Sequence, residues 1–140
     1  MRQKKINENN FIIMLERGEK IIESLQSFCE ENNVNFGYFH GLGAVDKIEL
    51  AHYRVDNKKY LNKVIEDALE ILSLYGNITT MDNKIYLHSH IVVSNDKMKA
   101  FGGHLKEAVI SATCEIILVS LKGSVDRLHD EKIGLNLLDI

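Results

Sequence analysis

The first third of the chain has the pattern of a strand followed by a helix. Residues 11–15 form a short apolar run bounded by polar residues, which is typical of a buried strand. Over residues 19–31 the apolar positions recur at i, i+1, i+4, i+7 and i+8, and this spacing predicts one amphipathic helix. We expect Gly18 to cap the start of the helix, and Asn32 with Asn33 to end it in a left-handed conformation.

The next segments alternate apolar and polar residues, as β-strands do. Residues 34–44 and 47–54 each predict a strand, joined at a bend that contains Gly41 and Gly43. No GxGxxG motif is present and no helix follows, so a phosphate-binding loop is disfavoured there. A β-bulge or a close backbone crossing is the better interpretation. Residues 60–65 fit either a strand or a short helix.

The second half of the chain is also rich in strand patterns. Residues 68–78 favour a strand, and we expect turns at residues 75–79 and 81–84. Residues 107–121 are nearly all apolar or small, and their second half should lie in the centre of the sheet. Residues 133–140 should form a closing strand.

The composition is that of an ordinary globular domain. The 140 residues are 45% hydrophobic and 26% charged, and no run of about 18 apolar residues indicates a membrane span. Many strands and one helix over residues 1–140 predict a single compact α+β domain, with a mostly antiparallel sheet packed with one main N-terminal helix. Cys29 and Cys114 fit buried thiols of a cytoplasmic protein, and the polar start lacks the apolar core of a signal peptide.

Three of the six histidines lie in one short segment. His88 and His90 are two residues apart in a β-prone run, so both side chains should point to the same face of a strand, roughly 7 Å apart. A polar turn at residues 94–97 can fold the chain back and bring His104 beside them. Three imidazoles with an open fourth position are typical of a non-structural zinc site. Histidines hydrogen-bonded in a core or an interface are the alternative.

A few other residues are candidates for chemistry. Glu115 interrupts an apolar run, and a buried carboxylate without a partner is costly. It could orient a ligand histidine or act as an acid–base group, or it could lie at an edge with its charge in water. His40 is either a fourth contributor to the metal site or a partner of the backbone. His52 and His129 fit solvated positions.

Five motifs occur in the order that is known from one protein family. They are FHGLGAV at 39–45, EILSLYGNI at 70–78, HSHIVVS at 88–94, GGHL at 102–105 and ATCEI at 112–116. Over nearly its whole length the chain resembles the plants-and-prokaryotes-conserved (PPC) domain. The resemblance implies a compact α+β fold and a homotrimer. It also implies a fold like that of a domain of acetolactate decarboxylase, a zinc enzyme with a histidine cluster.

The resemblance also implies an association with DNA. Prokaryotic members are usually labelled predicted DNA-binding proteins, whereas plant members bind the minor groove through an AT-hook that needs proline, and this chain has no proline. The net charge of −3 argues against broad electrostatic binding of nucleic acid, although a local basic patch is left open.

Three functional hypotheses follow from these patterns. The first is a homotrimeric DNA-associated or regulatory module that carries zinc on His88, His90 and His104. The second is a small metal-dependent enzyme, in which zinc polarises a carbonyl or activates water for an unknown small molecule. The third is a ligand sensor or scaffold whose function is its assembly.

Overall fold

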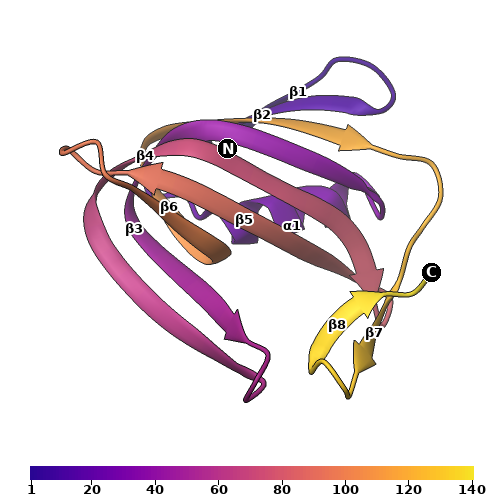
Figure 1. Ribbon diagram of the computed structural model, residues 1–140. Helices are drawn as coiled ribbons and strands as arrows, with labels where there is room; N and C mark the ends of the chain where they lie inside the picture. Colours follow the sequence, from indigo (N-terminus) through magenta and orange to yellow (C-terminus); the bar gives the residue numbers. More distant parts are fainter.

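An antiparallel sheet contains most of the chain (Figure 1). The computed structural model describes residues Met1–Ile140. The strands are β1 (Arg2–Lys5), β2 (Asn10–Glu16), β3 (Gly37–Arg54), β4 (Lys59–Met81), β5 (Lys84–Ser94), β6 (Ala100–Ser120), β7 (Arg127–Asp130) and β8 (Leu135–Leu138). Six of them form the main sheet in the order β1-β2-β6-β3-β4-β5, and β7 pairs only with β8. The predicted single domain, with a mostly antiparallel sheet and one helix, is confirmed.

Strand β6 changes its partner along its length, and this change closes the sheet on itself. Residues 100–104 pair with residues 90–94 of β5, whereas residues 104–120 pair with β3. Since β3 also pairs with β4, and β4 with β5, these four strands form a closed ring. Closure removes strand edges that would otherwise be open to pairing with other chains.

Glycines stand where two strands approach most closely. A Cβ at Gly102 would lie 2.2 Å from the carbonyl oxygen of Ile91, and a Cβ at Gly43 would lie 2.3 Å from that of Thr113. Only a hydrogen atom fits at either position. The register of β3 against β4 shifts between Gly41 and Gly43, so the predicted bulge is confirmed.

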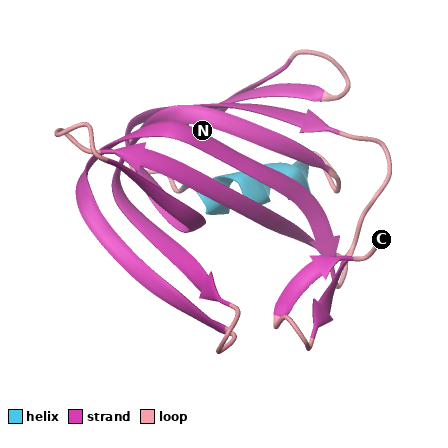
Figure 2. Cartoon of the chain, in the orientation of Figure 1, coloured by secondary structure: helices cyan, strands magenta, loops and turns pink.

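Helix α1 (Ile21–Glu31) lies against one face of the sheet (Figure 2). Its apolar stripe is the predicted one, and the buried residues are Ile21, Leu25, Phe28 and Cys29. The ring of Phe28 meets Phe11 of β2 edge-on, with the centroids 5.2 Å apart. Asn33, with φ 54°, ends the helix in the predicted left-handed conformation. The helix has 11 residues, and no helix of the protein is long and apolar enough to cross a membrane.

The start of α1 is capped from a distant strand. The prediction that Gly18 caps the helix is wrong, because Gly18 lies in the preceding turn with φ 86° and the N-cap residue is Lys20. The carboxylate of Glu107 in β6 accepts hydrogen bonds from the backbone N–H groups of Ile22 and Glu23, at 2.9 and 3.2 Å. A negative charge at this end of a helix is favourable, so Glu107 holds the helix on the sheet.

Strands β3 and β4 are longer than the sequence pattern indicated. The turn that we expected at residues 75–79 is absent, because β4 continues through it. Gly76 serves a packing role there: a Cβ on it would lie 2.3 Å from the Phe39 ring. Residues 60–65 are strand rather than helix, and the turn predicted at residues 81–84 is present between β4 and β5.

The C-terminal hairpin is a small sheet of its own. The closing strand expected at residues 133–140 exists as β8, but it pairs with β7 and not with the main sheet. The tip of this hairpin meets the end of the β3–β4 hairpin, residues 47–66, which we call the arm. The Tyr53 hydroxyl donates to the Ile133 carbonyl at 2.6 Å, and Lys58 donates to the Glu131 carbonyl at 2.7 Å.

We predict that Gly102→Ala destabilises the protein, because its methyl group would collide with the Ile91 carbonyl where β5 and β6 close the ring. The free energy of unfolding in urea should fall by about 1–3 kcal/mol, the usual cost of overpacking. Lys99→Ala, at an exposed position in the adjoining turn, is the control and should change little. Equal urea midpoints for Gly102→Ala and Lys99→Ala would show that the contact between β5 and β6 tolerates a side chain at position 102.

A candidate metal centre on the outer sheet face

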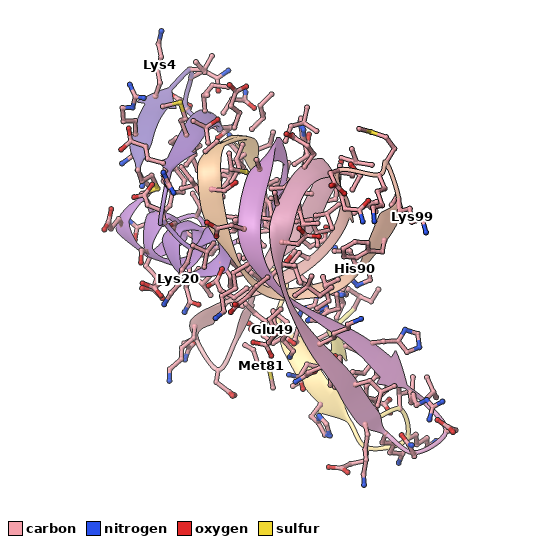
Figure 3. All side chains as sticks on the ribbon, turned by 90° about the vertical axis from the view of Figure 1, so that its left-hand side faces the viewer. Lys4, Lys20, Glu49, Met81, His90 and Lys99 are labelled. Atoms are coloured by element: carbon pink, nitrogen blue, oxygen red, sulfur yellow. The ribbon has the colours of Figure 1, made fainter.

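Strands β5 and β6 bring three histidines together. His88 and His90 lie on one face of β5, and His104 of β6 pairs directly with His90. Figure 3 shows His90 on the side of the sheet away from α1. One possible ligand nitrogen from each residue lies within 4.8 Å of the others. The approach that the sequence spacing predicted is therefore observed.

The spacing of the three rings fits a tetrahedral zinc ion. The ring centroids are 5.2 Å apart for His88 and His90, 5.4 Å for His88 and His104, and 5.6 Å for His90 and His104. Zinc binds imidazole nitrogen at about 2.0–2.1 Å, and tetrahedral angles then place the ring centres about 5.2 Å apart. Three such ligands leave a fourth position that no side chain of this trio fills.

Burial keeps two of these imidazoles neutral. Desolvation lowers the pKa of His104 to about 4, helped by the positive charges of His88, Lys106 and His90. Desolvation also lowers the pKa of His88, helped by Arg127 and His90. Neutral imidazole is the form that binds a metal, so at neutral pH the cluster is ready to act as a ligand set.

A buried arginine flanks the cluster on the His88 side. Arg127 donates from Nε to the Thr79 hydroxyl at 2.9 Å and from Nη1 to the Asn136 carbonyl at 2.8 Å. Its guanidinium lies over the Tyr86 ring, 4.9 Å from the centroid. Tyr86 precedes His88 by two residues on the same face of β5. Sequence analysis missed Arg127, because nothing in its polar segment indicates a buried side chain.

The other flank is aromatic and basic. The Tyr60 ring lies 5.8 Å from the His104 ring, and Lys106 Nζ lies 4.6 Å from the Tyr60 centroid.

A shallow pocket of about 220 Å³ opens beside the cluster, and it is lined by Tyr75, Gly76, Asn77, His88 and His90. The cluster is thus reached from solvent through a small, shallow pocket.

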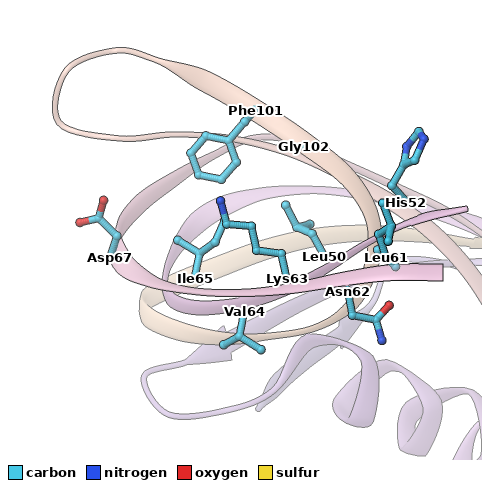
Figure 4. Close-up of a pocket in the computed structure, with 11 residues that line it drawn as sticks. Leu50, His52, Leu61, Asn62, Lys63, Val64, Ile65, Asp67, Phe101 and Gly102 are labelled. Carbon is cyan, nitrogen blue, oxygen red and sulfur yellow. The ribbon is translucent and has the colours of Figure 1, made fainter.

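A larger groove of about 740 Å³ lies elsewhere, between the arm and the first residues of β6 (Figure 4). Leu50, Ile65 and Phe101 supply apolar surface to it, and Lys63 and Asp67 supply charge. None of the three clustered histidines lines this groove, so it is separate from the candidate metal centre.

The structure does not bring Glu115 to the histidines. Glu115 lies two residues from Ile117, and three strand spacings of about 4.8 Å separate Ile117 from His90 across β3 and β4, roughly 15 Å in all. It is exposed and lines a small pocket with His40. The carboxylate therefore cannot orient these imidazoles within one subunit. His52 and His129 are exposed, as expected.

One row of side chains crosses five strands of the outer face and ends at the cluster. Neighbours in the row are Ile12, Ile117, His40, Tyr75 and His90. The exposed fractions are 38% for Ile12, 41% for Ile117 and 54% for Tyr75. This face therefore presents apolar and aromatic surface that no part of the chain covers.

Comparisons with known proteins point to one family. The model of the Plants and Prokaryotes Conserved (PCC) domain matches residues 2–122. A candidate DNA-binding protein from Bacteroides thetaiotaomicron is 30% identical with a TM-score of 0.95, over 99% of this chain and 96% of that one. A metal-containing protein from Archaeoglobus fulgidus is 31% identical with a TM-score of 0.88, over 94% and 93%. A plant- and prokaryote-conserved (PPC) protein from Pyrococcus horikoshii is 26% identical with a TM-score of 0.88, over 94% and 91%.

More distant likeness concerns the fold alone. Alpha-acetolactate decarboxylase from Bacillus subtilis is 14% identical with a TM-score of 0.56, over 92% of this chain and 60% of that one. The fold relationship expected from the sequence is thereby confirmed. No curated protein matches the sequence.

We predict that the metal-free protein loses stability as the pH falls from about 6.5 towards 4. The pKa of His104 is about 4 in the folded chain against an ordinary 6.5, so the unfolded chain binds the proton more readily in this window. The stabilising contribution is therefore complete above pH 6.5 and is lost as the pH drops through 4. Unfolding in urea with a chelator present, at several pH values, measures it.

His104→Gln should lose less stability than the wild type between pH 7 and pH 4.5, since it lacks this titrating group. His52→Gln, at an exposed position, is the control and should follow the wild type. Parallel profiles for His104→Gln and the wild type would contradict the assignment.

Proposed function

The chain belongs to the Plants and Prokaryotes Conserved (PCC) domain family, and on this premise we propose that it is a zinc-binding module that works as a homotrimer. The ligands would be His88, His90 and His104. The observation that carries the proposal is the spacing of the three imidazole rings, which matches a tetrahedral site. The metal-containing relative from Archaeoglobus fulgidus supports it.

Three imidazoles on adjacent paired strands form a preorganised ligand set with an open fourth position. Bound zinc would supply a Lewis-acidic position for a ligand from solution. The chain itself fixes the imidazoles through backbone pairing between β5 and β6, and His90 is exposed, so small molecules reach the cluster. A neutral set of three imidazoles leaves the full charge of the metal for an incoming ligand.

Trimeric assembly would cover the exposed row on the outer face. In β6, Ile116 and Leu118 are fully buried, while Ile117 between them faces outward and is 41% exposed. A partner subunit that packs on this face would remove Ile12, Ile117 and Tyr75 from water, which is favourable at about 25 cal/mol per Å² of apolar surface. The number of three subunits comes from the family resemblance.

Association with DNA is the second candidate, favoured by the name of the relative from Bacteroides thetaiotaomicron. The edge strand β1 offers the exposed basic residues Arg2, Lys4 and Lys5, and Arg2 is paired with Glu16. Such a short basic strip on a chain of net charge −3 supports only weak binding that fades steeply with salt.

A metal-dependent enzyme is the alternative for the same site, and the open coordination position favours it. Catalysis would need a group that moves protons. Glu115 lies too far away, and the side chains of that kind next to the cluster are Tyr60 beside His104, Tyr75 beside His90 and Tyr86 beside His88.

We predict that the purified protein binds one zinc ion per chain at neutral pH, and that His88→Ala or His90→Ala removes most of it. Each substitution deletes one of three protein ligands. Occupancy should fall below about pH 6, where free imidazole protonates. Elemental analysis after dialysis measures the content, and thermal unfolding should show that the variants stay folded.

His52→Ala is the matched control and should keep its zinc, because His52 is exposed on the arm. Full zinc content in the double variant of His88 and His90, or no zinc in the wild type with the metal in excess, would mean that the cluster is not a metal site.

We also predict a trimer mass in light scattering at micromolar concentration, and a smaller mass for Ile117→Asp, which would bury a carboxylate in the interface. Val55→Asp, at a position that is 63% exposed at the end of the arm, is the control and should remain trimeric. A monomer mass for the wild type would contradict the assembly. A trimeric Ile117→Asp would contradict only the choice of this face.

A further inference from the structure

The groove beside the arm is the mouth of the closed ring of strands. Its lining comes from β3, β4 and β6, three of the four strands that close the ring. Leu50 is 8% exposed and belongs to the apolar core, and Ile65 and Phe101 are partly buried against that core. The mouths of β-barrels are common places for small-molecule sites. The groove therefore gives a molecule from solution access to the end of the core.

A lysine occupies a core-facing position in this mouth. In the register of β3 against β4, Lys63 lies opposite Leu50, and two residues further along Ile65 lies opposite Ile48. Side chains that lie directly opposite in an antiparallel pair share one face, so Lys63 lies on the face of Leu50. Figure 4 shows Lys63 pointing into the groove from β4, with Phe101 facing it from β6.

The ammonium group of Lys63 has no anionic partner within the chain. Lys63 takes part in none of the ion pairs. The one carboxylate that lines the groove is that of Asp67, which points away from Lys63 (Figure 4) and accepts a hydrogen bond from the Ala68 N–H at 2.9 Å. A lysine stem packs on apolar surface while its charge stays available to a polar group. The groove therefore combines apolar walls with one free positive charge.

We propose that this mouth binds a small amphipathic carboxylate, with its hydrocarbon part on Leu50, Ile65 and Phe101 and its carboxylate on the Lys63 ammonium. The volume of about 740 Å³ lies within the roughly 300–1,000 Å³ of small-molecule sites. Burial of the hydrocarbon supplies affinity, at about 25 cal/mol per Å² of apolar surface. The charge-assisted hydrogen bond to Lys63 selects an anion over a neutral or cationic molecule with the same hydrocarbon part.

This site is independent of the candidate metal centre. None of the three clustered histidines lines the groove, and none of the groove residues belongs to the histidine cluster. The carboxylate site therefore does not rest on the proposed zinc. It can be tested on the metal-free protein, so that failure of one proposal leaves the other intact.

The test is a calorimetric titration with octanoate, with a chelator present so that no metal at the histidines takes up the carboxylate. We expect saturable binding of one octanoate per chain, with the negative heat-capacity change that marks burial of apolar surface. Acetate lacks the hydrocarbon part and octylamine carries the opposite charge, so each should bind at least about tenfold more weakly. A wild type that does not bind octanoate would overturn the proposal.

Lys63→Gln should bind octanoate at least about tenfold more weakly than the wild type, the effect of losing a charge-assisted hydrogen bond. Phe101→Leu, which reduces the apolar wall, should also weaken binding, and thermal unfolding of each variant shows that it stays folded. Lys84→Gln removes the same charge at the far end of β5 and is the control, with the affinity of the wild type. Equal octanoate affinity in the wild type and in folded Lys63→Gln would contradict the site.

Light scattering tests whether a second copy of the chain fills the groove instead. Leu61 lines the groove from the arm and is 54% exposed, so Leu61→Asp places a carboxylate in the mouth. If the mouth is a ligand site, this variant keeps the native mass of the wild type and loses affinity for octanoate. A smaller mass for Leu61→Asp would mean that a neighbouring subunit covers the groove, and the proposal would be wrong.

Discussion

The pairing of β6 with two different strands is the constraint on which the rest of the structure depends. At His104 the strand is in register with Ala51 of β3 on one side and with His90 of β5 on the other. The same backbone position therefore closes the ring and carries a ligand of the candidate metal centre. Gly102 makes this possible, since any side chain there would strike the carbonyl of Ile91. The placement of the imidazoles is thus set by hydrogen bonds of the backbone rather than by flexible side chains.

The two sides of the sheet therefore have different roles. The inner side holds the apolar core and α1. The Glu107 carboxylate binds the N-terminus of this helix and so holds it on the sheet. The outer side holds the histidines, the small pocket and the exposed row that ends at His90. Because Tyr75 belongs both to the row and to the pocket, a subunit that packs along the row would come close to the pocket rim. In such an assembly, the subunit interface and the entry for a ligand would share one surface.

Local patterns in the sequence were sufficient where the structure depends on near neighbours. Helix and strand periodicity predicts the apolar stripe of α1 and the shared face of His88 and His90. The polar turn at residues 94–97 predicts that the chain returns to bring His104 beside them. They were not sufficient where distant segments meet. Gly76 looks like a turn residue but makes room for Phe39, and Glu107 caps a helix 85 residues away.

The site shows the same limit. Glu115 stands out in the sequence as a carboxylate in an apolar run, yet its side chain faces outward from the exposed side of β6, far along the strand from His104. Arg127 does not stand out at all, because its burial depends on Thr79 and Asn136, which are remote in the sequence or lie across a hairpin. Periodicity tells which face of a strand a residue occupies, but not which segment folds over that face.

The C-terminal hairpin has a consequence for how such a protein can diversify. It is a separate two-stranded sheet, joined to the body by one bridge between Thr80 and Asp126, by Arg127 and by contacts with the arm. The core and the three histidines lie entirely on other strands. Substitutions confined to residues 127–138 could therefore change the charge that acts on His88 without rebuilding the scaffold. The hairpin of β7 and β8 can therefore vary in evolution independently of the main sheet, as the loops of a barrel vary while its strands are kept.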